Sequence, residues 1–206
     1  MGALYGTLTY KIFHVQEELP DDWKEAFLAS IKHRAFEPLE PESEEEEKYG
    51  WVPIETPLRV EFSQHNVVFD HFINLGLRHD KYAIPSGLLK AHIQQAERQY
   101  LIEQKKERIT KFEKEDIKTM IRKKLKERSL PKMGVTDMSW DVRSGRVRFW
   151  SQSNTNCELF QGLFADTFGL TILPANPYIT ATQLELDDRQ LELLKTIEPS
   201  DFMPAT

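Results

Sequence analysis

The sequence predicts an α+β fold, in which an antiparallel sheet with packed helices carries one long basic helical excursion over residues 86–130. Apolar and polar residues alternate in several short segments before residue 85 and after residue 137, which is typical of half-buried strands. Between residues 86 and 130 the apolar residues instead recur every three or four positions, as in amphipathic helices. This separation of strand and helix patterns favours the α+β class.

Length and composition agree with a globular protein. The 206 residues are 40% apolar and 29% charged, so we expect one domain over residues 1–198 and a loose tail over residues 199–206. No apolar run reaches the roughly 18 residues of a membrane span, and the first residues lack the features of a signal peptide. Cys157 is the only cysteine, which excludes an internal disulfide and favours a reducing, cytoplasmic location.

The first part of the chain predicts mainly strands. Alternation predicts a strand over residues 4–13, and Pro20 with two aspartates starts a helix over residues 21–34. The next features, in order, are an aromatic turn (49–53), an alternating segment (58–62), a turn (64–66) and one or two strands (67–84). The inward residues of the last segment are expected to be Phe69, Ile73, Leu75 and Leu77.

Two helices are predicted in the excursion. Pro85 suits the first turn of a helix that runs to about residue 108 and packs through Leu89, Ile93, Ala96 and Tyr100. Thr110 and Glu113 form a capping box for a second helix, which ends near residue 129. Its apolar side is expected to contain Ile117, Met120, Ile121 and Leu125.

A hairpin, a helix and a short strand are predicted next. Residues 138–149 alternate around Ser144-Gly145, the clearest hairpin signal in the chain. Thr155 and Glu158 form a capping box for a helix that ends at Gly169 and buries Cys157, Phe160, Leu163, Phe164 and Phe168. Residues 170–173 suit a last strand, and residues 187–197 suit a short terminal helix.

Charge is unevenly distributed along the chain. The net charge is −6, yet residues 78–148 carry 19 Lys or Arg and 10 Asp or Glu, a balance of +9. The other residues carry 8 and 23, a balance of −15, including seven glutamates within residues 37–47. We interpret that acidic segment as a solvated loop, with a carboxylate metal site as the alternative. The asymmetry predicts a basic working surface on an acidic body.

The basic face of the second excursion helix is the main candidate site. At about 100° per residue, most cations of residues 111–126 fall away from the apolar stripe centred on Ile117. Such a row of cations would release counterions from a nucleic acid. With flanking and hairpin residues, the predicted nucleic-acid contacts are Lys105, Lys106, Arg108, Lys111, Lys114, Lys118, Arg122, Lys123, Lys126, Arg128, Lys132, Arg146 and Arg148. The alternatives are a solvated helix face and ordinary cross-strand pairing of the hairpin arginines.

Signatures of catalysis are weak. The six histidines include no i, i+4 pair, and the chain has no glycine-rich phosphate loop and no Gly-x-Ser-x-Gly motif. Glu113, Glu115 and Asp116 could hold the magnesium ion of a nuclease, but carboxylates in a first helical turn commonly stabilise the helix dipole. We therefore expect no catalytic residue, no metal and no cofactor.

Several motifs, taken in order, are similar to those of the RdgC family of recombination-associated proteins. They are Ala35-Phe36-Glu37-Pro38, Gly50-Trp51-Val52-Pro53, Arg78 to Lys81 followed by Ile84-Pro85, Lys90, the Lys- and Glu-rich residues 103–128, Leu130-Pro131-Lys132, Asp141-x-x-x-Gly145 and Leu170-x-x-Leu173-Pro174. The resemblance covers most of residues 1–177. The Gly-Trp-Val-Pro motif is moderately specific, and the ordered series is more specific than any one motif.

The resemblance implies a ring-forming dimer that encircles or coats DNA without sequence preference and restrains the recombinase RecA. Family members are longer, with a C-terminal region that contributes to DNA contact and ring closure. Where the family commonly has Leu-Pro-Arg-Ala-Phe, this chain has Leu130-Pro131-Lys132-Met133-Gly134. The basic residue carries over as Lys132, whereas the aromatic residue is missing at Gly134. These departures concern ring closure more than DNA binding.

Pattern and resemblance together predict a non-catalytic, sequence-independent DNA-binding protein that acts in or restrains homologous recombination. We expect a nucleoid-associated homodimer without a membrane partner, which binds duplex or single-stranded DNA and RecA or its filament. Two alternatives stay open. One is a magnesium-dependent nuclease, and the other is an interaction module whose acidic surface docks on the recombination machinery without contacting DNA.

Overall fold

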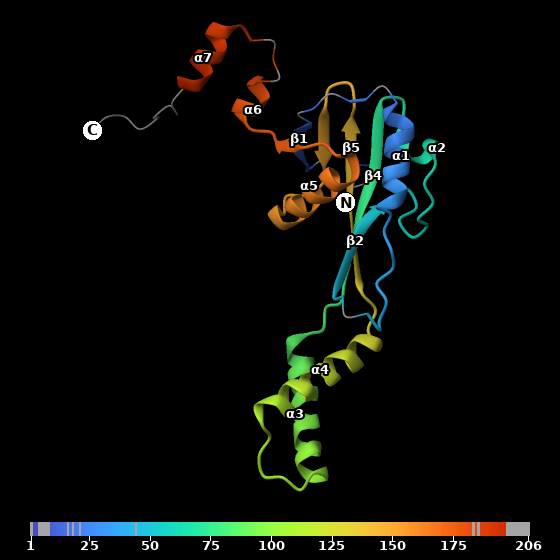
Figure 1. Cartoon of the computed structure of the whole chain (residues 1–206), viewed down its shortest axis with the longest axis vertical. Helices are drawn as coiled ribbons and strands as arrows, with labels where there is room; N and C mark the ends of the chain where they lie inside the picture. The colour runs from blue at the N-terminus through green and yellow to red at the C-terminus, as the bar shows by residue number, and fades with distance from the viewer. Residues whose placement is uncertain are drawn as a thin grey trace, which may run out of the picture.

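The computed structural model describes residues 2–3, 9–15, 17, 19–20, 22–43, 45–182, 184 and 186–196. Within these residues the chain forms one antiparallel sheet, helices packed on it, and a two-helix arm that extends from one end of the sheet (Figure 1). The predicted α+β class is therefore confirmed. No helix in the described part of the chain is both long and apolar enough to cross a lipid bilayer.

The sheet has the strand order β2-β4-β5-β6-β1-β7, with β3 paired to β4, and each pair is antiparallel. The strands are β1 (Lys11–Val15), β2 (Glu47–Val52), β3 (Val68–Phe69), β4 (Phe72–Lys81), β5 (Lys132–Asp141), β6 (Arg146–Phe149) and β7 (Ile172–Pro174). The helices are α1 (Trp23–His33), α2 (Gln64–Val67), α3 (Ser86–Glu103), α4 (Lys111–Glu127), α5 (Asn154–Phe168), α6 (Pro177–Thr182) and α7 (Asp188–Thr196). Helices α3 and α4 form the arm.

The core lies between the sheet and helices α1 and α5. From α5, Phe160 stacks on Phe149 of β6 with ring centroids 4.1 Å apart, and Phe164 lies 5.1 Å from the ring of Trp140 on β5. Phe27 of α1 contacts the same tryptophan at 5.5 Å. All five rings are buried, so aromatic packing joins both helices to the middle of the sheet. The predicted buried face of α5 is confirmed.

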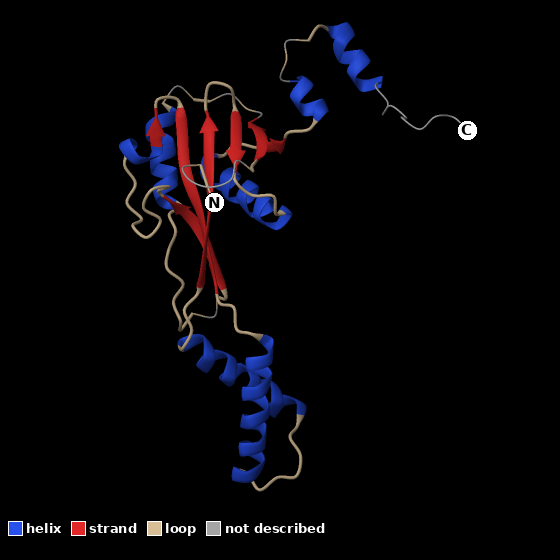
Figure 2. Ribbon diagram, turned by 180° about the vertical axis from the view of Figure 1, so that it is seen from behind, coloured by secondary structure: helices blue, strands red, loops and turns tan. Residues whose placement is uncertain are grey.

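Strands β4 and β5 are the longest pair and connect the core to the arm. They pair over ten positions, from Phe72 opposite Asp141 to Lys81 opposite Lys132. The end near Phe72 is buried through Ile73 and Trp140, whereas the end near Lys81 continues directly into the arm (Figure 2). The ladder therefore fixes where the arm leaves the body of the molecule.

The two N-terminal motifs that carry the family resemblance form one structural unit. The backbone N–H of Trp51 donates to Arg34 O at 3.0 Å, and that of Phe36 donates to Trp51 O at 2.9 Å. A Cβ at Gly50 would lie 2.6 Å from the Phe36 Cα, so only glycine permits this approach. The Trp51 side chain is fully buried, and its Nε1 donates to Thr167 Oγ1 at 2.8 Å.

The structure corrects several predictions in the first part of the chain. Residues 49–52 belong to β2 and do not form a turn, because they pair with β4. Residues 58–62 form no strand. The residues just before them lie between Pro53 and Pro57, neither of which has a backbone N–H to donate to a neighbouring strand. The expected turn at 64–66 is the short helix α2. Phe69 is largely exposed, since the chain reverses at Asp70, which has a φ of 56°.

Helix boundaries and faces also differ from expectation. Helix α3 ends at Glu103 and not near residue 108, because Lys105 adopts a left-handed conformation with a φ of 48°. Met120 is 56% exposed and lies outside the buried stripe of α4. The N-cap of α5 is Ser153, whose hydroxyl accepts from Asn156 N, so the predicted capping box at Thr155 is wrong.

Other predicted elements agree with the structure. The hairpin around Ser144-Gly145, the left-handed Gly169 after α5, and the terminal helix α7 are confirmed. The predicted strand over residues 170–173 corresponds to β7, and α6 was not predicted. Residues 4–8 of the expected first strand and the tail over residues 199–206 lie outside the described residues.

Glu113 joins the two helices of the arm and the loop between them. It forms the predicted capping box with Thr110, whose N–H donates to Glu113 Oε2 at 2.8 Å. The Tyr100 hydroxyl of α3 and the Lys106 ammonium of the loop donate to the same carboxylate at 2.7 Å and 2.5 Å. The Lys106 hydrogen bond, followed by those from Thr110 and Tyr100, lowers the pKa of Glu113 to about 2.

Replacing Trp51 by alanine should destabilise the whole fold. The change removes a buried ring and leaves Thr167 without its indole partner, so we expect a loss of about 3 to 5 kcal/mol in the free energy of unfolding. Urea denaturation measures this loss. Leu58→Ala is the control, since Leu58 is exposed and should change stability by less than about 0.5 kcal/mol. A Trp51→Ala variant as stable as the parent would contradict the view that the buried Trp51 side chain stabilises the fold.

Replacing Glu113 by glutamine should destabilise the protein in a pH-dependent way. The folded-state pKa of Glu113 lies below its ordinary value of 4.5. Its stabilising effect is therefore fully present above about pH 5 and is lost as the pH falls towards 2. Thermal unfolding should show a gap between Glu113→Gln and the parent that closes over this range. Glu107→Gln, in the exposed loop, is the control. A gap independent of pH would show that the charge of Glu113 does not stabilise the protein.

Candidate nucleic-acid interface

The structure places the predicted contact residues in two separate regions. One is the arm with its connection to β5, which holds Lys105, Lys106, Arg108, Lys111, Lys114, Lys118, Arg122, Lys123, Lys126, Arg128 and Lys132. The other is β6, which holds Arg146 and Arg148. Lys132 and Asp141, at opposite ends of β5, are about 30 Å apart at the usual rise of a strand. Since Arg146 pairs with Asp141, the sheet does not bring these arginines to the arm.

One face of α4 is exposed and basic. Ile117 and Ile121 are buried on the side that packs against α3, whereas Lys111, Lys114 and Lys118 are exposed. Lys118 Nζ lies 3.2 Å from Glu115, and Lys114 Nζ lies 4.0 Å from Glu97. Exposed ion pairs of this kind contribute little to stability, so a phosphate can replace the carboxylate partner.

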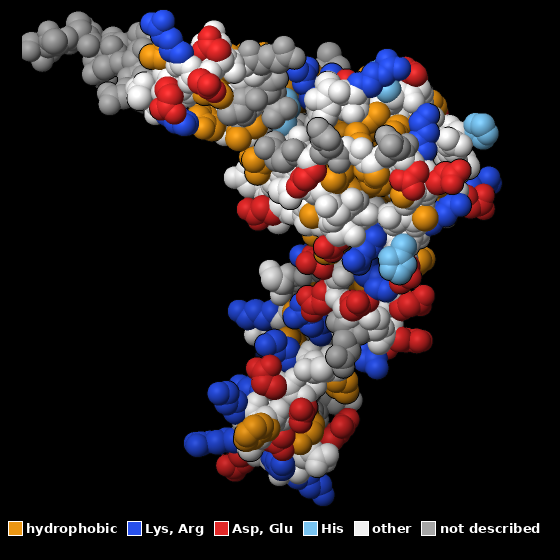
Figure 3. Space-filling model, turned by 45° about the horizontal axis from the view of Figure 1, so that its top comes forward, with side chains coloured by type: hydrophobic (Ala, Val, Ile, Leu, Met, Phe, Trp, Pro, Cys, Tyr) orange, Lys and Arg blue, Asp and Glu red, His pale blue; other side chains and the backbone are white. Residues whose placement is uncertain are grey.

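The loop at the tip of the arm carries further cations. Lys105 and Arg108 are exposed in the loop between α3 and α4, whereas Lys106 is bound to Glu113. In Figure 3, the lysine and arginine side chains of the arm point outward on more than one side, with acidic side chains among them. The arm is therefore a mixed surface with a local basic face along α4.

The other end of α4 contacts the acidic segment. The Arg122 guanidinium lies 2.6 Å from one oxygen of Glu46 and 2.8 Å from the other. Lys126 donates to the carbonyl oxygens of Ser43 and Glu45, the latter at 2.7 Å, and is only 8% exposed. The predicted exposure of Lys126 is therefore wrong, because Ser43 and Glu45 contact it at this end of the helix.

The described residues of the acidic segment form a largely exposed loop whose C-terminal end contacts neighbouring elements. Glu47 starts β2 and accepts from Lys81 Nζ at 2.9 Å, and that contact lowers the pKa of Glu47. The ammonium of Lys48 lies 3.2 Å from Glu45. Glu44 lies outside the described residues. The C-terminal end of the segment thus contacts both α4, through Glu46, and β4, through Glu47, which the sequence pattern did not reveal.

The hairpin arginines lie in a different environment. Arg146 is exposed and pairs across the strands with His14 and Asp141, whereas Arg148 is half-buried. Burial, and then the charge of Arg146, lower the pKa of His14. Trp150, the aromatic residue beside them, packs against Tyr10 with ring centroids 5.4 Å apart. Part of this surface is therefore used in packing within the sheet.

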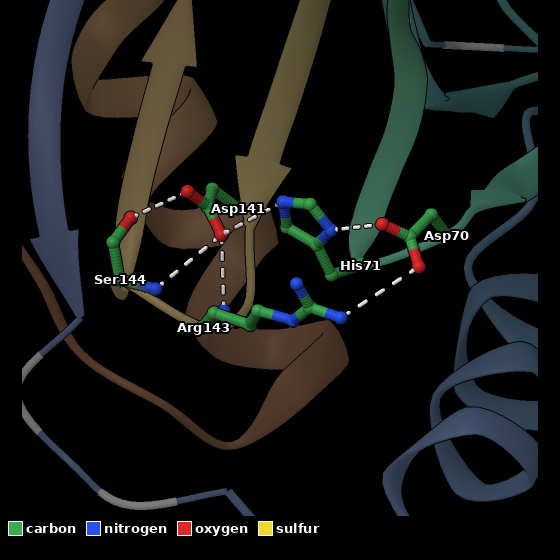
Figure 4. Close-up of polar contacts among 5 residues, drawn as sticks. All are labelled: Asp70, His71, Asp141, Arg143 and Ser144. Carbon is green, nitrogen blue, oxygen red and sulfur yellow. Dashed lines mark hydrogen bonds and ion pairs between the residues drawn. The ribbon is translucent and has the colours of Figure 1, made fainter.

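A polar network at the far end of β5 was missed by sequence reasoning (Figure 4). Asp141 accepts hydrogen bonds from Arg143 N, Ser144 N and the Ser144 hydroxyl. His71 lies between Asp70 and Asp141, and its hydrogen bond lowers the pKa of Asp70. The serine hydroxyl donates to a carboxylate and not to the imidazole, so the network has the form of a stabilised turn. The Asp-x-x-Ser-Gly pattern is the sequence signal for it.

Two of the three carboxylates considered for a metal site are otherwise engaged. Glu113 is bound by Thr110, Tyr100 and Lys106, and Glu115 by Lys118. Over the ranges that the structure describes, no group of three or more His, Cys, Asp or Glu side chains is placed to hold a metal ion. The geometry gives Glu113 a structural role in the arm.

A family model described as "Putative exonuclease, RdgC" matches residues 9–186. The match extends beyond residue 177, where the motif resemblance ends, and includes the arm and the whole described sheet. A search of curated proteins finds no match. RdgC proteins are recombination-associated and bind DNA. Since the match spans most of the sequence, the chain belongs to the RdgC family.

Proposed function

We propose that this protein binds DNA without sequence preference and acts in or restrains homologous recombination, with the arm as its contact surface. The observation that carries the proposal is the exposed face of α4 formed by Lys111, Lys114 and Lys118. These residues span about 10 Å of helix, and a duplex presents about six phosphates over that length. Contacts to phosphates carry no direct information about base identity.

The proposed activity is non-catalytic. In support, Glu113 forms part of the arm's structure, and Glu115 pairs with Lys118. Restraint of RecA, assembly as a homodimer and association with the nucleoid belong to the same proposal, on the basis of family membership. The family description names a nuclease, so cleavage is the outcome that would favour the enzyme alternative.

DNA affinity should depend steeply on salt and little on sequence. If about four to six phosphates are neutralised, the log–log slope of the association constant against salt should be roughly −3 to −6. Fluorescence anisotropy with two scrambled 20-base-pair duplexes, from low to physiological salt, measures both properties. A flat salt response or a strong preference for one duplex would contradict the proposal. The same duplexes incubated with and without magnesium should stay intact, and cleavage would indicate a nuclease.

Neutralising the basic face of α4 should weaken binding to every DNA sequence alike. In a Lys111→Gln, Lys114→Gln, Lys118→Gln variant, glutamine keeps the helix propensity, and each lost phosphate contact should reduce the salt slope by about one. The matched control replaces Lys24, Lys32 and Lys195, which are exposed elsewhere, and should leave the slope unchanged. Parental affinity in the α4 variant would show that this face is only solvated.

A further inference from the structure

The junction between the sheet and the arm contains a pocket that the proposed phosphate contacts do not use. Its volume is about 550 Å³, within the range of small-molecule sites. One wall is formed by α4 through Arg122 and Lys123, and another by the chain that follows β4, including Tyr82 and Ile84. Glu46 of the acidic segment also lines it. The pocket therefore lies between the acidic segment and the basic helix.

The α4 wall of this pocket, called the root pocket below, is cationic. Arg122 is held by both oxygens of Glu46, and each of these side chains is about half exposed. Lys123 makes no hydrogen bond or ion pair with any described residue and is exposed. Lys126, behind them, is fixed on two carbonyl oxygens and carries its charge into the wall. An incoming anion would meet one free and one weakly paired cation.

The opposite wall is apolar. Tyr82 is buried, and the Lys126 ammonium lies 5.1 Å from the centre of its ring. The backbone N–H of Tyr82 donates to Glu46 O at 2.9 Å. Ile84 and Leu89 continue this wall and are half-buried. An apolar wall facing a cationic wall suits a ligand with a flat ring at one end and an anion at the other.

We propose that the root pocket binds one nucleotide, with its base against the apolar wall and its phosphate on Arg122 and Lys123. The phosphate takes the place of the Glu46 carboxylate, whose two oxygens both contact Nη2 of Arg122, since a guanidinium group binds carboxylate and phosphate oxygens alike. Apolar contact with a base is tolerant of sequence. The bases of a duplex are stacked and paired, so the pocket selects an unpaired nucleotide.

The nucleotide can come from a DNA strand or from free solution. In the first case the inference rests on the proposed function and extends it, because the root pocket then gives a preference for single-stranded over duplex DNA. In the second case the root pocket binds a free nucleotide independently of DNA binding by the arm. Both sources present the same base and phosphate, so the probes must distinguish them.

Anisotropy measurements with labelled (dT)12, a blunt 20-base-pair duplex and a labelled thymidine monophosphate test the proposal. In an Arg122→Gln, Lys123→Gln variant, the affinity for (dT)12 should fall about tenfold more than the affinity for the duplex, because a base contact is lost with the phosphate contacts. The matched control, Lys111→Gln with Lys118→Gln, removes two charges outside the pocket and should weaken both DNAs by the same factor. Circular dichroism melting checks that both variants fold.

Two further variants and a control test the exchange of anions. Glu46→Gln should raise the affinity for (dT)12, because Arg122 is released, whereas Glu40→Gln, in the same segment but outside the pocket lining, should have a much smaller effect. Arg122→Lys keeps the charge but not the planar guanidinium, so its affinity for (dT)12 should fall between those of the parent and of the Arg122→Gln, Lys123→Gln variant.

The outcomes separate this inference from the proposed function. If the parent binds thymidine monophosphate and the Arg122→Gln, Lys123→Gln variant (the root variant) does not, the pocket is assigned to free nucleotides. If the root variant loses affinity only for (dT)12, the pocket is assigned to a DNA strand. Equal weakening of (dT)12 and duplex in the root variant, with no binding of the mononucleotide, would overturn the pocket but leave DNA binding by α4 intact. If the protein binds the mononucleotide but no DNA, the proposed function is overturned and nucleotide binding by the root pocket stands.

Discussion

Strands β4 and β5 pair at ten successive positions, and this ladder determines where the other parts of the molecule lie. Its inner half supplies Leu75 and Trp140 to the core, against which α1 and α5 pack. Its outer half extends past the core and ends where α3 begins and where α4 returns. A slip of one residue would turn the buried side chains of the slipped strand to the other face, so core packing also holds the arm in place.

The arm in turn depends on a small number of polar contacts. Few of its side chains are buried, and α3 has no fully buried residue. Glu113 joins the two helices at the tip of the arm, and the contact of Lys126 with Ser43 and Glu45 joins its base to the body. Carboxylate and carbonyl groups therefore join the elements of the arm, whereas aromatic packing joins the elements of the core. Charge in this protein has a structural role as well as a proposed binding role.

Local patterns predicted the elements whose residues interact with near neighbours in sequence. The Thr110–Glu113 capping box and the hairpin at Ser144-Gly145 are examples, since their hydrogen bonds lie within a few residues. The burial of Phe160 and Phe164 followed from helical periodicity for the same reason. What the pattern could not give is contact between distant segments. Lys126 looks exposed on a helical wheel, but Ser43 and Glu45, more than 80 positions earlier, bind its ammonium group.

The central claim is that the exposed face of α4 contacts DNA phosphates directly. Lysine acetylation, read by mass spectrometry with and without a saturating 20-base-pair duplex, tests it residue by residue. Bound DNA should protect Lys111, Lys114 and Lys118 from acetylation and leave Lys24 and Lys32 on α1 as reactive as in the free protein. Equal reactivity of the α4 lysines in the free and bound states would contradict it.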